Sequence, residues 1–136
     1  MTQTADGNDL RAIVQEVYGR VGAGDWEGAE RYLSDDLVII EAENLPYAGL
    51  YTGRGALREL HGIVMAHWID PVLDFHAMTA GDGHVVSLVT FHFTSRRSGR
   101  RIAMPLAEVF RIEAGKVVEI KPFYFDTKAI ARLEHP

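Results

Sequence analysis

The sequence contains no cysteine, which excludes disulfides, thiol nucleophiles and thiolate metal sites. It also lacks an excess of positive charge, because 14 lysines and arginines stand against 19 aspartates and glutamates. A broad basic surface for a nucleic-acid backbone is therefore not expected. No apolar run approaches the roughly 18 residues of a membrane span, and the polar N-terminus lacks the apolar core of a signal peptide. These absences predict a soluble, cytoplasmic protein that binds neither nucleic acid nor membrane.

The chain does contain enough apolar sequence for one core. Its 136 residues are 47% hydrophobic and 24% charged, which is typical of a single globular domain. Because the sequence has no internal repeat, low-complexity tract or long linker, residues 1–136 are predicted to form one domain.

Helical periodicity dominates the first half of the sequence. Apolar residues recur at helical spacing over residues 10–21, 26–33 and 57–68, which predicts three helices. The β-branched residues 37–43 predict a strand between the second and third helices. The following loop, residues 44–53, is rich in glycine, proline and tyrosine and is predicted not to pair regularly.

The second half of the sequence changes to the alternation of strands. Four segments, residues 71–78, 84–95, 100–112 and 116–125, alternate in polarity, and turn residues join them as hairpins. A short helix is predicted to follow over residues 127–133. Helices followed by antiparallel hairpins predict an α+β fold, in which a curved sheet buries one face against the helices and encloses a cone.

Several of these segments together resemble the nuclear transport factor 2-like superfamily. The resemblance is carried by AGDW (residues 23–26), SDD (34–36), PYAGLYTG (46–53) and EVFRIEAGKVVEIKPFYFD (108–126), and it covers nearly the whole chain. The sequence is most similar to SnoaL-like polyketide cyclases and ketosteroid isomerase-like proteins. The resemblance implies a cone-shaped fold with an apolar pocket, usually a dimer, and chemistry that differs between members.

The isomerase-like proteins supply two candidate acids. Their general base is an acidic residue of the first strand, and Glu41 matches that position. Their protonated acid, which helps to bind the enolate oxygen, matches Glu108. Alternation places Glu108 on one face with Leu106 and Phe110, where burial favours its neutral form. The alternatives are that Glu41 is a solvated carboxylate and that Glu108 pairs with an arginine of residues 96–101.

Asp126 is a third candidate acid. SnoaL-like cyclases carry an acid/base aspartate at the matching place, after the last strand, and alternation puts Asp126 on one face with Pro122 and Tyr124. The alternative is that Asp126 caps the last helix by accepting an amide hydrogen. The sequence leaves both roles open.

Aromatic residues supply further candidates. The tyrosine of the isomerase oxyanion hole matches Val17, so the chain departs from the isomerases there, with Tyr18 beside it. We expect Tyr18 and Tyr124 to be orienting phenols. No histidine spacing predicts a metal site and no glycine-rich turn has phosphate-loop spacing, so neither a metal nor a cofactor is predicted. The predicted substrate-binding residues are Trp26, Tyr47, Tyr51, His61, Trp68, Phe91 and Phe110.

These residues together suggest a cofactor-free acid/base enzyme. We expect an isomerase, cyclase or dehydratase that acts on a small apolar carbonyl or polyketide-like compound, with Glu108 as proton donor or oxyanion partner and Glu41 or Asp126 as base. The alternative is a non-catalytic ligand-binding or assembly module of the same fold. We also expect a homodimer through the outer face of the sheet. The residues that make this face apolar are Thr90, His92, Val109, Phe123 and Phe125.

Overall fold

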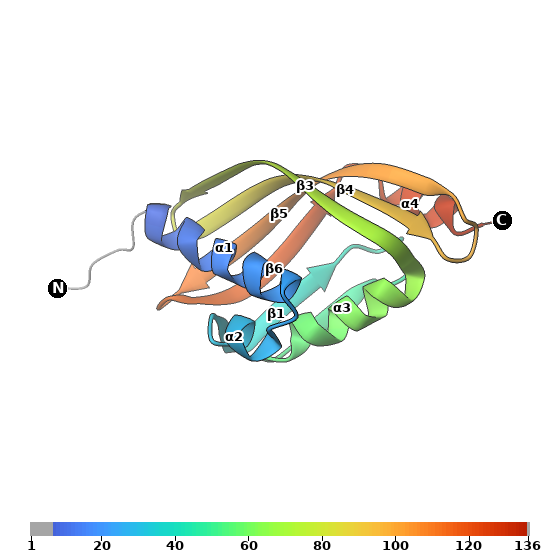
Figure 1. Cartoon of the computed structure of the whole chain (residues 1–136). Coiled ribbons are helices and arrows are strands. Elements are labelled where there is room, and N and C mark those ends of the chain that lie inside the picture. The colour runs from blue at the N-terminus through green and yellow to red at the C-terminus, as the bar shows by residue number, and fades with distance from the viewer. Residues whose placement is uncertain (1–6, 136) are drawn as a thin grey trace.

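The computed structural model describes residues 7–135, whose elements follow the order expected from the sequence, with one additional strand. Figure 1 shows α1 and α3 on one side of the strands and α4 near one end of the sheet. The helices are α1 (Gly7–Gly22), α2 (Trp26–Glu30), α3 (Ala56–His67) and α4 (Thr127–Leu133). The strands are β1 (Leu33–Glu41), β2 (Gly49–Thr52), β3 (Trp68–Gly81), β4 (His84–Ser95), β5 (Arg101–Glu113) and β6 (Lys116–Tyr124).

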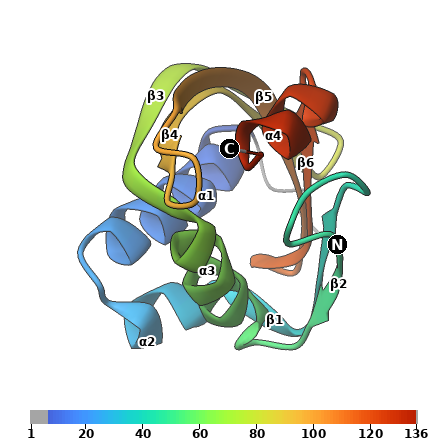
Figure 2. The same ribbon diagram turned by 90° about the vertical axis from the view of Figure 1, so that its right-hand side faces the viewer.

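The strands form one curved sheet in the order β2-β1-β6-β5-β4-β3. Neighbouring strands are antiparallel except for β1 and β6, which are parallel. Seen end-on, the sheet curves around α1 and α3, which lie on its concave side (Figure 2). This arrangement confirms the predicted α+β fold. None of the helices in the described residues has the length and apolar character that a membrane crossing requires.

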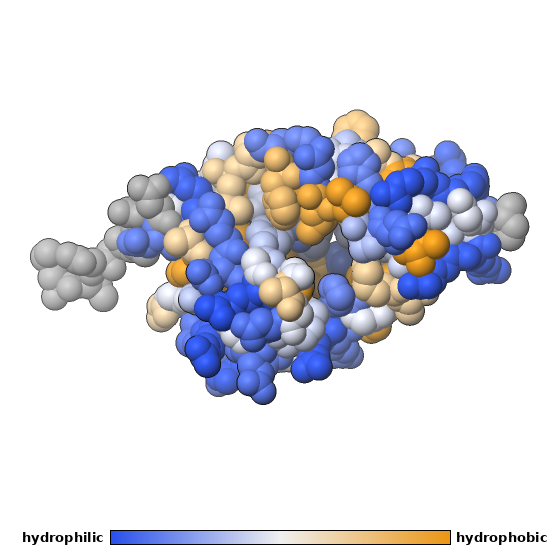
Figure 3. All heavy atoms as spheres, viewed as in Figure 1, coloured by the Kyte–Doolittle hydropathy of each residue, from blue (hydrophilic) through white to orange (hydrophobic). Residues whose placement is uncertain are grey.

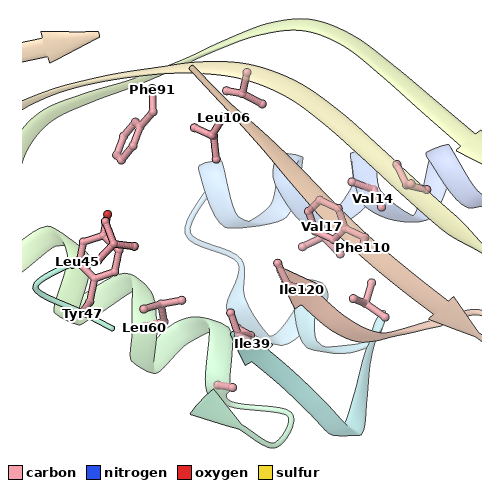
Figure 4. Close-up of a cluster of buried hydrophobic side chains, with 14 of the residues drawn as sticks. Val14, Val17, Ile39, Leu45, Tyr47, Leu60, Phe91, Leu106, Phe110 and Ile120 are labelled. Atoms are coloured by element: carbon pink, nitrogen blue, oxygen red, sulfur yellow. The ribbon is translucent and has the colours of Figure 1, made fainter. Parts of the chain in front are cut away.

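Alternation along the strands divides the sheet into a concave, buried face and a convex face, as the sequence predicts. On β4, Val89, Phe91 and Phe93 are buried, and they pair on β5 with inward-facing residues such as Leu106. The apolar side chains of the sheet and helices therefore meet on the concave side. Those labelled in Figure 4 are Val14, Val17, Ile39, Leu45, Tyr47, Leu60, Phe91, Leu106, Phe110 and Ile120.

The segment around β1 and β2 differs from the sequence prediction. The prediction that residues 44–53 do not pair is wrong for Gly49–Thr52, which forms β2 and pairs with β1. Leu33, predicted to be helical, instead opens β1 and pairs with Val117 of β6. Both differences arise from pairing between segments that are distant or irregular in sequence, which local periodicity does not report.

Trp68 joins α3 to β3 and anchors one end of the interior. Its backbone is extended, with φ −117° and ψ 148°, and it pairs with Ser95 instead of continuing α3 as predicted. The side chain is fully buried, and its ring centroid lies 4.5 Å from that of Phe93. Because burial of a large aromatic ring contributes strongly to stability, tertiary packing decides where this helix ends.

Asp126 follows β6 and caps α4. Its backbone is extended, and its Oδ1 accepts a hydrogen bond from the amide of Ala129 at 3.0 Å. The side chain is exposed. Of the two roles that the sequence leaves open for Asp126, the structure shows the helix cap.

Asp126→Ala is expected to lower the free energy of unfolding by about 1 kcal/mol near neutral pH, because an amide at the start of α4 loses its acceptor. Asp126→Asn keeps an acceptor and should cost much less. Lys128→Ala, an exposed substitution in the same helix, is the matched control. Urea denaturation measures all three, and wild-type stability of Asp126→Ala would contradict the capping role.

Candidate functional site

A row of polar side chains crosses the middle of the concave face. Ser87 of β4 pairs with Glu108 of β5, which pairs in turn with Pro122 of β6. β1 runs parallel to β6 on its other side, and its register, in which residue 39 pairs with residue 120, places Glu41 level with Pro122. Because adjacent strands lie about 4.8 Å apart and the sheet curves inward, these side chains converge on the space enclosed by the helices.

Tyr18 reaches this row from α1. It lies one helical turn after Val14, which is fully buried, so the helix turns both residues toward the sheet. The Tyr18 Oη donates a hydrogen bond to Oε1 of Glu108 at 2.7 Å. Its ring lies edge-on to those of Phe75 and Phe110, with centroids 4.8 and 5.6 Å away. Burial, with the neighbouring charge of Glu108, raises the pKa of Tyr18 far above its usual range, so the phenol keeps its hydrogen.

Glu41 ends β1 on the inward face, with only 6% of its surface exposed. Its Oε1 is buried and has no hydrogen-bond partner among residues 7–135. Burial, together with repulsion by Glu108, raises the pKa of Glu41 to about 8. The neutral, protonated form of Glu41 therefore predominates at pH 7.

Glu108 is the member of the pair whose ionised form has a hydrogen-bond donor, Tyr18. Burial raises the pKa of Glu108, while the hydrogen bond from Tyr18 opposes this by stabilising the ionised form. No described residue gives the buried Oε1 of Glu41 such a donor, and a charge on Glu108 raises the pKa of Glu41 further, so this asymmetry favours ionisation of Glu108 over Glu41. The salt bridge considered for Glu108 does not form, since Arg96 and Arg100 of the β4–β5 hairpin donate to backbone carbonyls elsewhere.

A chain of hydrogen bonds ends at Tyr124, on the same concave face. The indole Nε1 of Trp68 donates to Oη of Tyr47 at 3.3 Å, and the hydroxyls of Tyr47 and Tyr124 lie 3.1 Å apart. An indole is a donor only, so Tyr47 accepts from Trp68, and either hydroxyl of the Tyr47–Tyr124 pair can donate to the other. Within residues 7–135 the hydroxyl of Tyr124 has no partner besides Tyr47.

The remaining predicted residues separate into core and surface. Tyr51 is half-buried and donates to the carbonyl of Tyr47 at 2.8 Å, which holds the loop before β2. The structure places His61 at the surface instead of the interior, with its ring 5.2 Å from that of the half-buried Trp26. The predicted binding residues that the structure buries in the core, besides Tyr47, are Trp68, Phe91 and Phe110.

Ser87 is a site residue that the sequence analysis did not select. It is fully buried, and its Oγ has no hydrogen-bond partner in the part of the chain that the structure describes. The signal was present in the alternation of β4, where Ser87 occupies a buried position between Val85 and Val89. A buried polar atom without a partner requires an explanation beyond packing.

Residues 14–120 match the model of the SnoaL-like domain family, which is most of the chain. The chain belongs to this family. No functionally curated protein matches the sequence.

Solved structures show the same fold for this SnoaL-like domain. An NTF2-like protein from Burkholderia thailandensis has a TM-score of 0.84 at 23% identity, covering 93% of this chain and 98% of that one. TerC, co-crystallized with polyporic acid, has a TM-score of 0.80 at 19% identity, with coverages of 93% and 98%. A candidate polyketide cyclase from Xanthomonas campestris has a TM-score of 0.75 at 16% identity, with coverages of 94% and 98%. These likenesses confirm the NTF2-like fold.

Other surface features of this SnoaL-like domain lie away from the carboxyl pair. One groove runs along α1 around Gln15, and another lies on the convex face around Arg111, and neither includes Glu41 or Glu108. In the described residues no three histidine or carboxylate side chains gather in a way that holds a metal. The concave face brings together Glu41, Glu108 and the phenols of Tyr18 and Tyr124.

Glu41→Gln is expected to remove a loss of stability at high pH. The pKa of Glu41 rises from 4.5 to about 8 on folding, so the native state binds more protons than the unfolded state between these values. Wild-type stability should therefore fall as pH rises through this window, by on the order of a few kcal/mol from this group. Urea denaturation at pH 5, 7 and 8.5 measures it. Glu43→Gln, an exposed neighbour, is the control, and identical pH profiles for Glu41→Gln and wild type would contradict the raised pKa.

Proposed function

We propose that this SnoaL-like domain is a cofactor-free acid/base enzyme that acts on a small, largely apolar carbonyl compound, by isomerisation, cyclisation or dehydration. The observation that supports it most is the carboxyl pair of the concave face. Glu41 is buried without a partner for Oε1, and Glu108 accepts a hydrogen bond from Tyr18. One protonated and one ionised carboxyl group at the same pH is what combined acid and base catalysis requires.

In the proposed site Glu108 is the base and Glu41 is the acid, the reverse of the roles expected from the resemblance to the isomerases. The hydrogen bond from Tyr18 favours the ionised Glu108 and fixes its orientation. Tyr124 is a second donor to the substrate oxygen in this proposal, with Tyr47 donating to Tyr124 when the substrate is bound; the 3.1 Å contact between the two hydroxyls allows this direction. Burial first, and then Tyr47, Glu41 and Glu108, raise the pKa of Tyr124, as expected if the three acidic groups face the same enclosed space.

The proposed step removes one proton from the substrate and delivers another. Glu108 takes a proton from the carbon beside the carbonyl group, and the electron pair of the broken C–H bond forms the double bond of an enol. Glu41 gives its proton to the carbonyl oxygen, and Tyr124 donates a hydrogen bond to that oxygen. The single negative charge of the pair passes from Glu108 to Glu41, so the buried site never gains a second charge. Return of the proton to a different carbon completes an isomerisation.

A binding pocket on the concave side is part of this proposal. Glu108, Tyr18 and Tyr124 keep accessible surface although burial raises their pKa values, as expected for groups that line an enclosed hollow. Figure 3 shows apolar surface over β3 and a hollow beside it, between β3 and the helices. There β3 leaves Leu73 and Phe75 42% and 47% exposed, and Phe75 lies against Tyr18. An apolar entrance beside the two acids suits a largely apolar ligand.

The solved neighbours support a carbonyl compound as the ligand class. TerC was co-crystallized with polyporic acid, a hydroxyquinone, and the Xanthomonas protein is a candidate polyketide cyclase. Both compound types carry several carbonyl or hydroxyl oxygens on a mostly carbon skeleton. A ligand of that kind would place apolar surface against Leu73 and Phe75 and oxygen atoms toward Glu41 and Tyr124.

The protein is expected to exchange the α-hydrogens of a ketone probe, indan-1-one, with D₂O, measured by ¹H NMR. Glu108→Gln should lower the exchange rate about 100-fold or more, because the base is lost. Glu41→Gln should lower it less, because an amide still donates a hydrogen bond to the carbonyl oxygen. The wild-type rate should fall above pH about 8, where Glu41 loses its proton.

Glu43→Gln, exposed and two residues from Glu41, is the matched control and should exchange the probe at the wild-type rate. The alternative function, a ligand-binding or assembly module without chemistry, predicts a different outcome. In that case indan-1-one binds, as seen by saturation-transfer NMR, but neither wild type nor any variant exchanges its α-hydrogens.

A homodimer through the convex face is a further part of the proposal. Ala77, Leu88, Ala107 and Phe123 pair in sequence across β3, β4, β5 and β6, which makes an apolar row over the sheet. Leu88 and Phe123 are 45% and 52% exposed, and Phe125 beside them is 83% exposed. Apolar rows of this extent on a regular sheet face are typical of subunit interfaces.

Phe123→Glu combined with Phe125→Glu is expected to convert a dimer into a monomer, because a charge would be buried on each side of the interface. Sedimentation velocity at micromolar concentration measures this. Leu50→Glu, which is 68% exposed on the edge strand β2, is the control and should leave the dimer intact. A wild-type protein that sediments only as a monomer would overturn the proposed dimer.

A further inference from the structure

Ser87 is a buried polar group that neither the fold nor the proposed reaction uses. Its side chain is fully buried on the concave face, directly across from Glu108. Its hydroxyl lies near Tyr18 and partly opposes the rise that burial causes in the pKa of that phenol, as a weak donor would, but its Oγ makes no hydrogen bond of acceptable geometry with any residue from 7 to 135. Tyr18 itself donates to Glu108. The hydroxyl hydrogen of Ser87 is therefore available on the inner face of the sheet.

Ser95, on the same strand and the same face, shows what a structural serine looks like here. It is equally buried, but its Oγ accepts hydrogen bonds from the amides of Arg97 and Ser98, both at 3.2 Å. Those bonds hold the β4–β5 hairpin. Ser87 has no comparable task, and a buried hydroxyl without a partner lowers the stability of the fold. Its position is explained if a ligand supplies the missing partner.

The position of Ser87 defines which part of a ligand it would meet. Glu108, on β5, has neighbours on both sides. Ser87 lies on β4 on one side, and Tyr124 and Glu41 lie on β6 and β1 on the other. The proposed base thus has oxygen-binding groups on both flanks. A substrate whose reacting carbon lies over Glu108, with its carbonyl oxygen between Glu41 and Tyr124, extends on its other side toward Ser87.

We propose that Ser87 is a specificity-determining residue whose hydroxyl binds a second oxygen of the substrate, on the far side of the reacting carbon from the carbonyl group. The site thereby selects carbonyl compounds that carry a hydroxyl or a second carbonyl group at that position. This inference rests on the proposed function for the placement of the first oxygen, and on the burial and missing partner of Ser87 for the second.

Two ketones of the same skeleton test the selection. In indan-1-one the carbon beside the carbonyl is followed by a CH₂ group, and in 3-hydroxyindan-1-one that CH₂ carries a hydroxyl group. The wild-type protein is expected to bind the hydroxyketone about tenfold more tightly, because only this probe satisfies the Ser87 hydroxyl. Ser87→Ala should bring the two affinities together, mainly by weakening the hydroxyketone. Isothermal titration calorimetry measures the four dissociation constants.

Thermal unfolding of the free protein tests independently whether the Ser87 hydroxyl stabilises the fold. Ser87→Ala is expected to raise the midpoint by about 3 °C, because it removes a buried hydroxyl that has no partner. Ser95→Ala, its matched control, should lower the midpoint, since two amides lose their acceptor. A destabilised Ser87→Ala protein would show that the hydroxyl serves the fold, and this would overturn the proposal.

The binding outcomes are equally decisive. Equal affinities of the wild type for the two ketones, no binding of either one, or an affinity ratio unchanged by Ser87→Ala would each overturn the role of Ser87. Failure of the proposed function looks different: indan-1-one is then not exchanged with D₂O, or Glu108→Gln exchanges it as fast as wild type, whatever the two affinities are.

Discussion

The hydrogen bond from Tyr18 to Glu108 connects α1 to the centre of the sheet across 90 residues of sequence, and the electrostatics of the interior depend on it. Glu41 and Glu108 both lie on the concave face, where burial raises the pKa of each. Burial alone therefore does not determine which of the two carboxyl groups holds a proton. A donor bound to one of them breaks that symmetry. The donor favours the charge on Glu108 and the proton on Glu41, and the proposed division into base and acid rests on this contact between a helix and a strand.

The concave face contains features that oppose folding. Oε1 of Glu41 and Oγ of Ser87 are buried without partners among residues 7–135, and each such atom costs about 1–3 kcal/mol. Packing elsewhere offsets this cost, as in the fully buried rings of Trp68 and Phe93. Unpartnered polar atoms gathered in one row beside a carboxyl pair are the cost on which the proposed binding site rests, since real proteins depart from full polar satisfaction at functional sites.

Alternation in a strand follows from backbone geometry alone, so the sequence was sufficient to predict that Glu108 shares an inward face with Leu106. The same counting did not settle Asp126, because β6 ends at Tyr124 and the chain turns into α4, where alternation no longer applies. The association of Glu41 with Glu108 depends on β1 lying parallel to β6, which spacing along the chain does not encode. The sequence could not single out Ser87, because a small uncharged residue is common on strands and only the structure shows that its buried hydroxyl has no partner.

At pH 7 Glu41 is expected to hold a proton while Glu108 is ionised. ¹³C NMR of protein labelled at the glutamate carboxyl carbons tests this most directly. One carboxyl resonance, absent from Glu41→Gln, should titrate near pH 8, while the resonance that is lost in Glu108→Gln should already report the ionised form at pH 7. If every glutamate resonance titrates near the ordinary value of about 4.3, both carboxyl groups are ionised at neutral pH, and the acid/base pair does not exist.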